Sequence, residues 1–485
     1  MNFSTAKTIS TLLLMLIVAV FLSCSDSTTT SVDPNPNPNP NPNPDPTPEE
    51  PAFIELTGDL PTQTLSADKK YLLKGQVFVR DGQTLTIDPG TVIFGDKRTR
   101  ATLIIDKGGK IIARGERENP IVFTSAQEPG VRDRGDWGGL VILGRANTNQ
   151  PNPAIEGITP EVFFGTFNST EFDEESSGEL IFVRVEFGGI ELSPNNETNS
   201  ITMGGVGRGT IMEYNMVSFG GDDGFEWFGG TVNGKYFISH AMWDDDFDCD
   251  YGWSGNVQYG LVVRYPGFAD QSTSNGIECD NGPNDNDVQP LTTATFSNLT
   301  ILGPIQNGDR VGNSNYGYAM DLRRRVSASV FNSVMTGFPN GIRMNQPSVY
   351  DNYNEGRGVL QNNILVALEN TAFRAGTGVD ADNVKDYWLE HNSFIPGPYS
   401  DQIHTELGLK SNDVFFGNKL ADQYPRNPDF TVTTGILAAG ADFSHAKFSE
   451  PHRTGFFDEV DFIGAFGADN WTTGWTEFDP VNAEY

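Results

Sequence analysis

The chain has 485 residues, a formal net charge of −32, 53 glycines and 37% hydrophobic residues. A charge this negative repels nucleic acid and anionic membrane surfaces, so we expect no nucleic-acid partner. Long helical stretches of Ala, Leu, Glu and Lys are missing outside the N-terminus, whereas Gly, Asn, Asp and aromatic residues are abundant. This composition is typical of a β-rich protein with many turns.

The first residues have the pattern of an export signal. Lys7 precedes the apolar run TLLLMLIVAVFL (11–22), which is too short for a transmembrane helix. The run ends in FLSC and resembles a bacterial lipoprotein signal, which implies that residues 1–23 are removed and that Cys24 is lipidated. Contact with a membrane would then be limited to this anchor.

Residues 24–51 have the composition of a stalk. The segment DPNPNPNPNPNPDPTPEEP (33–51) alternates proline with polar residues. Such a sequence adopts the extended polyproline-II conformation, so the segment would span roughly 50–60 Å at about 3.1 Å per residue. We expect this stalk to hold the folded part of the protein away from the membrane.

Short strands separated by Gly-rich turns recur from residue 70 onward. YLLKGQVFVRDGQTLTIDPGTVIFGD (71–96) is followed by ATLIIDKGGKIIARGERENPIVFTS (101–125) and by GDWGGLVILGRAN (135–147). Because no helical crossover separates strands that recur at a regular spacing, the pattern favours a solenoid over a sandwich or barrel. We predict an all-β, right-handed parallel β-helix over residues 52–440, with a non-repeating cap over residues 441–485.

Asparagines recur at one place in the repeat, five residues before a Gly or Ala. In a parallel β-helix, side chains at such a position can stack from coil to coil, whereas asparagine is also common in ordinary turns. We predict a single asparagine ladder. It comprises Asn215, Asn298, Asn332, Asn362 and Asn392.

The segment WDDDFDCDYGW (243–253) holds five aspartates within seven residues. Aligned with neighbouring repeats, it places one alternating set of side chains in the core and the other set outside. The predicted inward pairs are Phe225/Trp227, Phe247/Cys249, Ile277/Cys279, Tyr318/Met320 and Ile342/Met344. The predicted outward pairs are Glu226/Phe228, Asp248/Asp250, Glu278/Asp280, Ala319/Asp321 and Arg343/Asn345.

Two consequences follow from this alignment. Outward carboxylates on adjacent coils lie about 4.8 Å apart, so they need cations, arginines or raised pKa values to offset their repulsion. We predict a Ca²⁺ site formed by Glu226, Asp248, Asp250, Glu278 and Asp280. Cys249 and Cys279 share one inward column at a spacing that permits a disulfide, although two buried free thiols remain an alternative.

Four segments together resemble a group of exported lipoproteins of Bacteroidota. They are residues 71–96, PIVFTS (120–125) with DWGGLVILG (136–144), GDDGFEWFGGTVNGKYF (221–237) and VDFIGAFGADNWTTGWTEF (460–478). The resemblance covers residues 60–480 and implies a right-handed parallel β-helix, without implying an activity. It also implies an outer-membrane lipoprotein exposed at the cell surface.

The function that we expect is binding or structural, with the acidic strip holding Ca²⁺ and a glycan as the candidate partner of a monomer. Trp243, Tyr251 and Trp253 flank the aspartates and could stack on sugar rings. The alternative is a Ca²⁺-dependent polysaccharide lyase, with Arg343 or Lys235 as the base, by analogy with lyases of this fold. A hydrolase using Asp223 with Asp246 or Asp248, and a purely adhesive protein with a solvated acidic face, are further alternatives.

Overall fold

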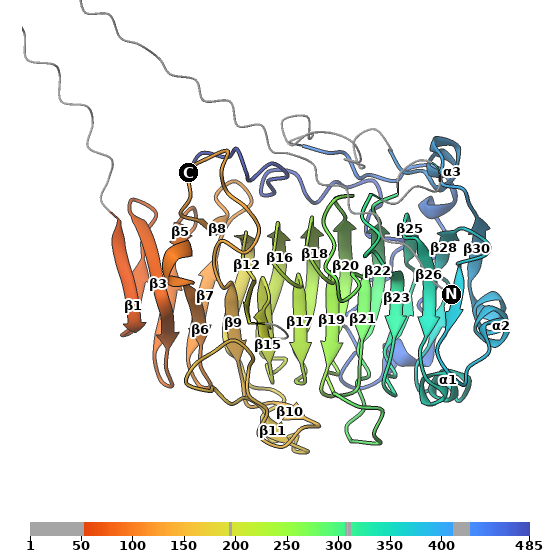
Figure 1. Ribbon diagram of the computed structural model, residues 1–485, viewed down its shortest axis with the longest axis horizontal. Helices are drawn as coiled ribbons and strands as arrows, with labels where there is room; N and C mark the ends of the chain where they lie inside the picture. Colours follow the sequence, from red (N-terminus) through yellow and green to blue (C-terminus); the bar gives the residue numbers. More distant parts are fainter. Residues whose placement is uncertain (1–52, 194–195, 306–307, 309–311, 411–426) are drawn as a thin grey trace, which may run out of the picture. The chain divides into compact units, whose positions relative to one another are not determined.

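The computed structural model describes residues 53–193, 196–305, 308, 312–410 and 427–485. The expected signal peptide, Cys24 and the stalk lie outside these residues. The described chain winds into stacked coils, in which 26 strands form one hydrogen-bonded sheet (Figure 1). Each strand pairs in parallel with the strand of the coil before it and the coil after it, as in β17–β19 and β19–β21. The predicted parallel β-helix is confirmed.

The pairings divide the sheet into three faces. Face A contains β6 (Thr102–Ile105), β9 (Leu140–Leu143), β15 (Ile201–Gly204), β17 (Phe225–Phe228), β19 (Phe247–Asp250), β21 (Ile277–Cys279), β23 (Tyr318–Leu322), β26 (Asn340–Met344) and β29 (Phe373–Ala375). Face B contains β5 (Val92–Gly95), β8 (Ile121–Ser125), β25 (Val334–Thr336), β28 (Ile364–Ala367) and β30 (Ser393–Pro396). Face C contains β2 (Gln63–Leu65), β4 (Thr84–Ile87), β7 (Lys110–Arg114), β24 (Ser329–Phe331) and β27 (Leu360–Gln361).

Longer strands bend from one face into the next. Faces C and B share β12 (Gly178–Glu186), β16 (Ile211–Ser218), β18 (Gly234–His240), β20 (Asn256–Val263) and β22 (Thr295–Leu302). On the first two coils, β1 (Ile54–Asp59) and β3 (Lys70–Val79) are parallel partners, and β3 bends from face B into face A. Two short pairs lie in the loops: β10 (Asn147–Thr148) with β11 (Thr166–Phe167), and antiparallel β13 (Ile190–Ser193) with β14 (Asn196–Thr198).

Helices are few and short. The α-helices are α1 (Pro347–Asn354), α2 (Ala381–His391) and α3 (Asp401–Leu407), which lie together at the end of the solenoid where the last coils are (Figure 1). The 3₁₀ turns are η1 (Lys97–Thr99), η3 (Ile436–Ala438) and η4 (Ala446–Ser449). Among the described residues, no helix is both long and apolar enough to cross a membrane.

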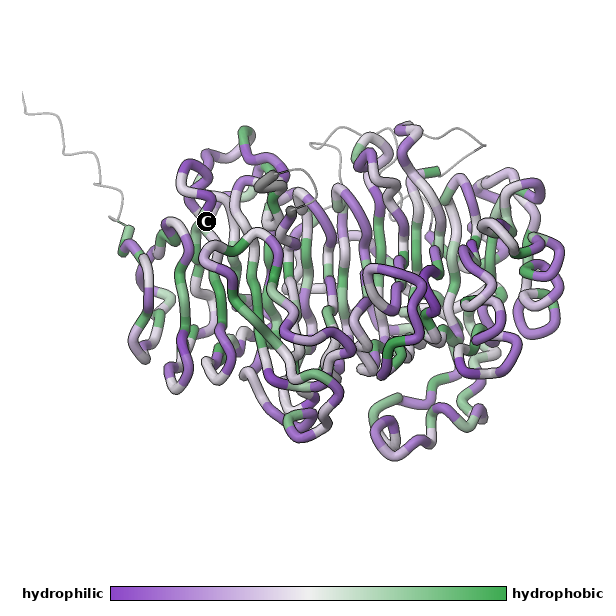
Figure 2. The backbone as a smooth tube through the Cα atoms, turned by 60° about the horizontal axis from the view of Figure 1, so that its bottom comes forward, coloured by the Kyte–Doolittle hydropathy of each residue, from purple (hydrophilic) through white to green (hydrophobic). Residues whose placement is uncertain are grey.

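The core follows the alternation expected of strands. Along β17, Phe225 and Trp227 are buried while Glu226 and Phe228 keep some exposure. Phe225 stacks on Phe247 of the next coil, with ring centroids 5.9 Å apart. Apolar stretches therefore follow the coils, and polar residues dominate the loops (Figure 2).

The predicted facing of the acidic repeats is correct except in β23, where Tyr318 is partly exposed beside Arg343 and Ala319 is buried in the core. One predicted register is also wrong. Phe225 lies opposite Phe247 and Phe247 opposite Ile277, as aligned. In the next coil, however, Glu278 lies opposite Asp321, whereas the alignment placed it opposite Ala319. A shift of two residues preserves which side chains point inward, so the hydrophobic pattern alone does not reveal it.

The asparagine ladder is divided between two columns. Asn298, Asn332 and Asn362 occupy a left-handed bend, with φ of 56°, 50° and 60°, and Asn362 Nδ2 donates to Asn332 Oδ1 at 2.7 Å. In the earlier coils, tyrosines occupy this bend, and Asn215 is the residue after one of them. Asn392 instead accepts a hydrogen bond from the amide of Asn363, at 2.9 Å. Asparagine suits this bend because its short side chain tolerates the left-handed conformation.

The predicted cap, residues 441–485, does not cover the last open coil. It belongs to a longer segment, residues 427–485, which we call the C-terminal strap. The strap runs along the side of the coils, back towards the first strands (Figure 1). The side chain of Asn332 donates to the carbonyl of Asp442 at 3.1 Å, Tyr236 packs edge-on against Trp471, and Lys70 donates to the carbonyl of Tyr485 at 2.6 Å. The strap packs on this side because the left-handed bend carries a column of aromatic and asparagine side chains, which pack against its rings and donate hydrogen bonds to its carbonyls.

Trp475 tests how firmly the strap is attached. Its side chain is completely buried and packs edge-on against Phe182 and Tyr214, at 5.8 and 6.1 Å between ring centroids. We expect Trp475→Ala to lower the free energy of unfolding by about 3–5 kcal/mol, because a large cavity opens between strap and coils. Denaturant-induced unfolding measures this change.

The matched control is Ile436→Ala, since Ile436 lies in the same strap but is 46% exposed. It should change stability by less than about 0.5 kcal/mol. If the two variants unfold alike, the strap does not unfold together with the coils.

Candidate functional site

A cavity of about 560 Å³ lies on the outer side of face A, over β17, β19 and β21. Strand pairing builds its floor: Glu226 lies opposite Asp248, and Asp248 lies opposite Glu278. Two directly opposed carboxylates at a strand spacing of about 4.8 Å repel by on the order of 3 kcal/mol at an effective dielectric constant near 20. The floor therefore needs positive charge or protons.

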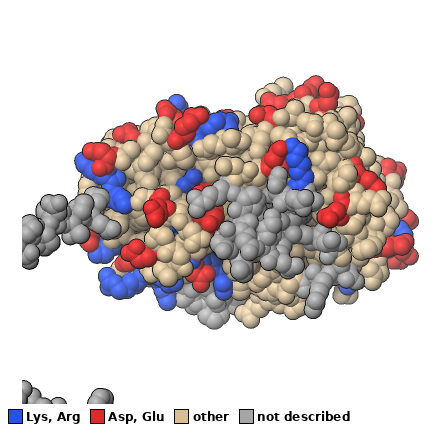
Figure 3. Space-filling model, turned by 90° about the horizontal axis from the view of Figure 1, so that it is seen from above, with Lys and Arg blue, Asp and Glu red and all other residues tan. Residues whose placement is uncertain are grey.

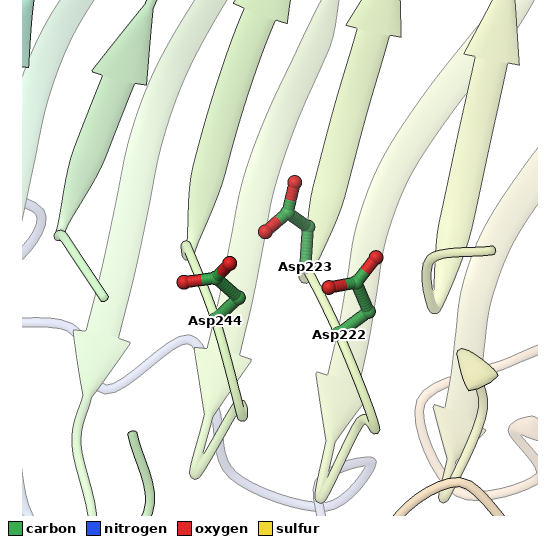
Figure 4. Close-up of side chains that lie close together, drawn as sticks. All are labelled: Asp222, Asp223 and Asp244. Atoms are coloured by element: carbon green, nitrogen blue, oxygen red, sulfur yellow. The ribbon is translucent and has the colours of Figure 1, made fainter. Parts of the chain in front are cut away.

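Aspartates in the turns before these strands also line the cavity, which we call the acidic cleft. Asp222 and Asp223 precede β17, and Asp244 and Asp245 precede β19 at the same offset from its first residue. Figure 4 shows Asp222, Asp223 and Asp244 gathered at the starts of neighbouring strands. The predicted cation site did not include these turn residues, although two Asp-Asp pairs at one offset from their strands were a usable signal.

Three sets of carboxylates offer oxygen atoms within 4.8 Å of one another. The sets overlap, because Asp223 belongs to two of them and Asp248 belongs to two. They are Asp222–Asp223–Asp244, Asp223–Glu226–Asp248 and Asp245–Asp248–Glu278.

Hydrogen bonds hold several of these carboxylates by one oxygen. Asp223 Oδ1 accepts from the amide of Asp245 at 2.7 Å, and Glu278 Oε2 accepts from the side chain of Asn275 at 3.0 Å. The amide of Asn275 donates to Asp245. These bonds fix the direction of the carboxylates and use one oxygen each of Asp223 and Asp245, whereas the second oxygen of Glu278 contacts Arg323.

Asp248 lies at the centre of the cleft. Its Oδ1 atom is buried and accepts no hydrogen bond from any described residue. An unsatisfied buried carboxylate oxygen is costly, so Asp248 requires a proton or a cation. The donor set fits a hard cation such as Ca²⁺, since the described residues that line the cavity supply many carboxylate oxygens and neither histidine nor cysteine.

Burial and mutual repulsion raise the pKa values of the cleft carboxyls. Burial is the largest cause in each case, and neighbouring carboxylates add to it. The pKa of Asp244 rises to about 6 and that of Asp248 to about 7. The pKa rises well above the ordinary range at Asp222, Asp223, Glu226, Asp245, Asp250 and Glu278.

One predicted cation ligand, Asp280, is held by arginines instead. Arg323 binds both carboxylate oxygens of Asp280, at 3.0 and 2.6 Å, and also contacts Glu278. Arg324 donates to Asp280 at 2.6 Å. Asp280 is therefore neutralised by protein, whereas the other predicted ligands, Glu226, Asp248, Asp250 and Glu278, line the cavity.

Of the three aromatic residues predicted to contact a ligand, Trp243 and Tyr251 line the cavity. Trp243 is anchored by a hydrogen bond from its Nε1 to Asp270, at 2.9 Å, and by the guanidinium of Arg134, 3.6 Å from the ring centroid. The prediction for Trp253 is wrong. Trp253 is fully buried, because the chain after β19 directs its side chain into the core. There it stacks on Trp227, with ring centroids 4.3 Å apart.

The two residues proposed as a lyase base are not among the described residues that line the cavity. Lys235 lies on β18 and forms an ion pair with Asp458 of the strap, at 2.8 Å. Arg343 lies on β26, one strand beyond Asp321, and binds both oxygens of that carboxylate. Arg323 and Arg324 instead form the basic wall of the cleft.

The hydrolase pairing of Asp223 with Asp246 is also excluded. Asp246 is fully buried, 3.2 Å from Arg264 Nη1, and accepts a hydrogen bond from Ser239 at 2.6 Å. It belongs to the interior of the coil. The side of the molecule seen in Figure 3 carries both acidic and basic residues.

Beneath the floor of the cleft, Cys249 and Cys279 form a disulfide. They are direct partners in the β19–β21 pairing, with Cα atoms 4.7 Å apart. Both side chains are at most 1% exposed. The disulfide therefore joins the two strands whose outward residues include Asp248 and Glu278.

Raised carboxyl pKa values predict that, with EDTA present, the protein loses stability as pH rises. A carboxyl with a folded pKa above its unfolded value of about 4 binds its proton more tightly in the folded state, so stability falls as pH rises through the folded pKa. For Asp248 that pKa is about 7. We expect the melting temperature to fall by several degrees between about pH 6.5 and 8.5.

Asp248→Asn is the control, because it removes the central carboxylate without changing its size. Its melting temperature should fall less over the same range. The range starts at about pH 6.5 because two buried histidines have the opposite effect at lower pH. The pKa values of His240 and His404 are lowered to about 3 and about 4, so below about pH 6.5 they make the protein more stable as pH rises. Equal slopes for the two proteins would contradict the assignment.

Comparison with known proteins supports the fold and identifies the family. A family model described as a pectate-lyase-like β-helix domain matches residues 58–392, which is more than half of the chain. Searches of curated proteins and of solved structures find no match. The chain therefore belongs to the pectate-lyase-like β-helix domain family.

Proposed function

We propose that the acidic cleft binds a divalent cation, Ca²⁺ in the first place, and that the bound cation helps to hold a glycan. The observation that carries this proposal is the buried, unpartnered Oδ1 of Asp248. Asp245 and Glu278 present oxygens within 4.8 Å of one another and of Asp248. A divalent cation would offset the repulsion among them and satisfy that oxygen.

Ca²⁺ suits this cleft better than a softer or smaller cation. It accepts six to eight oxygen ligands in flexible geometry, whereas Mg²⁺ requires a near-octahedral set. The overlapping carboxylate sets supply many oxygens at the start and in the middle of neighbouring strands. Because the three sets share Asp223 and Asp248, they do not imply three ions. Calorimetry would measure the number of ions bound.

The glycan part of the proposal is supported by the family and by the cleft walls. A pectate-lyase-like β-helix domain indicates a carbohydrate-related role at the level of the family. Trp243 and Tyr251 line the cavity beside the carboxylates. An apolar ring face next to hydrogen-bonding groups is the combination that a sugar requires.

We further propose that the protein acts at the cell surface, where Cys24 would anchor it by lipid and the proline-rich stalk would extend it. The lipoprotein-like signal in the sequence supports this location. Oxidised Cys249 and Cys279 are consistent with an exported protein.

Thermal melts with millimolar Ca²⁺ and with EDTA test cation binding. Ligand bound only by the folded state raises its stability by about 2.7 kcal/mol at a hundredfold excess over Kd. We expect Ca²⁺ to raise the melting temperature of the native protein by several degrees. Asp248→Asn should melt higher than the native protein in EDTA, because repulsion is relieved, and should gain little from Ca²⁺.

The control is Asp287→Asn, which removes an exposed carboxylate outside the set that lines the cavity. It should keep the full gain from Ca²⁺. If Ca²⁺ stabilises none of the three proteins, the aspartates form a hydrated surface and the cation site is refuted. If Asp287→Asn also loses the gain, the effect of Ca²⁺ is a general one on charge.

A Ca²⁺-dependent lyase is the second candidate, and the observation that favours it is the basic wall formed by Arg323 and Arg324. Arg324 is 35% exposed in its side chain and could pair with the carboxylate of a uronate. In β-elimination a base removes the proton next to that carboxylate, the bond to the leaving oxygen breaks, and the leaving oxygen takes up a proton. A double bond remains in the new chain end.

Incubation with polyuronates, followed by ultraviolet absorbance, measures the double bond. The lyase interpretation predicts absorbance that requires Ca²⁺ and that Arg324→Ala reduces by roughly 10²-fold or more. Arg357→Ala, which removes an arginine that is not among the residues lining the cavity, should leave the rate unchanged. Absence of product with every uronate tested would exclude this lyase activity and leave the binding role.

A further inference from the structure

The disulfide joins two strands that carry directly opposed carboxylates. Cys249 and Cys279 are cross-strand partners, and the residues immediately before them, Asp248 and Glu278, are cross-strand partners on the opposite side of the sheet. Asp248 and Glu278 also belong, with Asp245, to one set of close carboxylates. The same two strands thus carry the repelling charges outside and the covalent bond inside.

The disulfide also closes the segment that forms one wall of the cleft. Its cysteines are separated by 30 positions in sequence, and the residues between them include Asp270 and Ser272, which line the cavity. Ser272 donates to Asp244 at 2.6 Å, so this wall is tied to the turn before β19. Both edges of the segment are fixed at the cysteines.

Hydrogen bonding alone holds these strands weakly. The β19–β21 pairing covers Phe247–Ile277, Asp248–Glu278 and Cys249–Cys279. By comparison, the preceding pairing on the same face, β17–β19, covers four residue pairs, and the β20–β22 pairing covers seven over faces C and B together. A short pairing under carboxylate repulsion needs another attachment while no cation is bound.

We propose that the Cys249–Cys279 disulfide holds the cleft carboxylates at their spacing in the cation-free protein, so that cation affinity depends on whether this pair is oxidised. The inference rests on the proposed function for its cation, and it assigns both cysteines as positioning residues of that site. With the bond intact, a cation enters a prepared site. With the bond reduced, binding must also bring the strands together.

Linkage makes the effect reciprocal. If the disulfide tightens cation binding by some factor, bound cation disfavours reduction of the disulfide by the same factor at equilibrium. Reduction by dithiothreitol supplies two electrons and two protons, yielding two thiols and cyclic oxidised dithiothreitol. The cation should therefore protect the disulfide although it contacts neither sulfur atom.

The first experiment measures this protection on the native protein. Dithiothreitol is added with Ca²⁺ or with EDTA, and newly formed thiols at Cys249 and Cys279 are labelled and located by mass spectrometry. We expect Ca²⁺ to reduce the extent of reduction at equilibrium by about tenfold. Sucrose, at a concentration that raises the melting temperature as much as Ca²⁺ does, should give much less protection, because it stabilises the whole fold without binding the cleft.

The second experiment measures affinity by calorimetry. Cys249→Ala with Cys279→Ala should bind Ca²⁺ about tenfold more weakly than the native protein. Met344→Ala is the control for loss of packing, because Met344 lies in the same inward column, opposite Leu322, which is itself opposite Cys279. It should bind Ca²⁺ as the native protein does, and an unchanged affinity in the double variant would overturn the proposal.

Hydrogen exchange separates this inference from the proposed function. In EDTA, the amides of β19 and β21 should exchange several-fold faster in the double variant than in Met344→Ala, because the strands separate without the bond. If the native protein fails to bind Ca²⁺ but this difference is seen, the cation site is refuted and the role of the disulfide in holding the strands is retained. If the native protein binds Ca²⁺ but exchange and affinity are unchanged, the role of the disulfide is refuted.

Discussion

Parallel stacking of coils places each side chain about 4.8 Å from the side chain at the same position on the next coil, and the other features of this protein depend on that spacing. Where the repeated residue is aromatic, stacking is favourable: Tyr214 and Tyr236 lie 4.3 Å apart between ring centroids. Where it is asparagine, amides bond from coil to coil. Where it is a carboxylate, the same spacing is unfavourable. In the cleft, therefore, side chains on adjacent coils repel one another, whereas elsewhere the stacked side chains attract one another.

The protein offsets that repulsion differently along face A. At the end nearer the last coils, arginines neutralise the carboxylates: Arg343 binds Asp321, and Arg323 binds Asp280. Around Asp248, the described structure provides no such partner for Oδ1. Acidic residues occur in both regions, so what distinguishes the cleft is that its central carboxylate has an oxygen without an arginine partner. We therefore place the proposed cation site where the arginines end and the carboxylates continue.

The fold could be predicted well from sequence, because strand alternation and repeat spacing depend on local chemistry. The facing of Phe225, Trp227, Phe247 and Cys249 followed from alternation alone. Register across the insertion after Cys279 could not be predicted, since a shift of two residues keeps every side chain on the same side. The inward position of Trp253 and the pairing of Asp280 with Arg323 depend on where turns direct the chain. Four of the five predicted ligands line the cleft, whereas the prediction omitted the turn aspartates that line it too.

The C-terminal strap has a consequence for the order in which the protein assembles. Each coil pairs with neighbours close in sequence, so coils can form one after another. The contact between Lys70 and Tyr485, in contrast, joins residues 415 positions apart. Contacts of such long range form slowly, because a long loop must close first. A chain synthesised from its N-terminus would therefore form its acidic cleft before the strap packs against the coils. A cation that binds during synthesis would bind to coils that the strap does not yet stabilise.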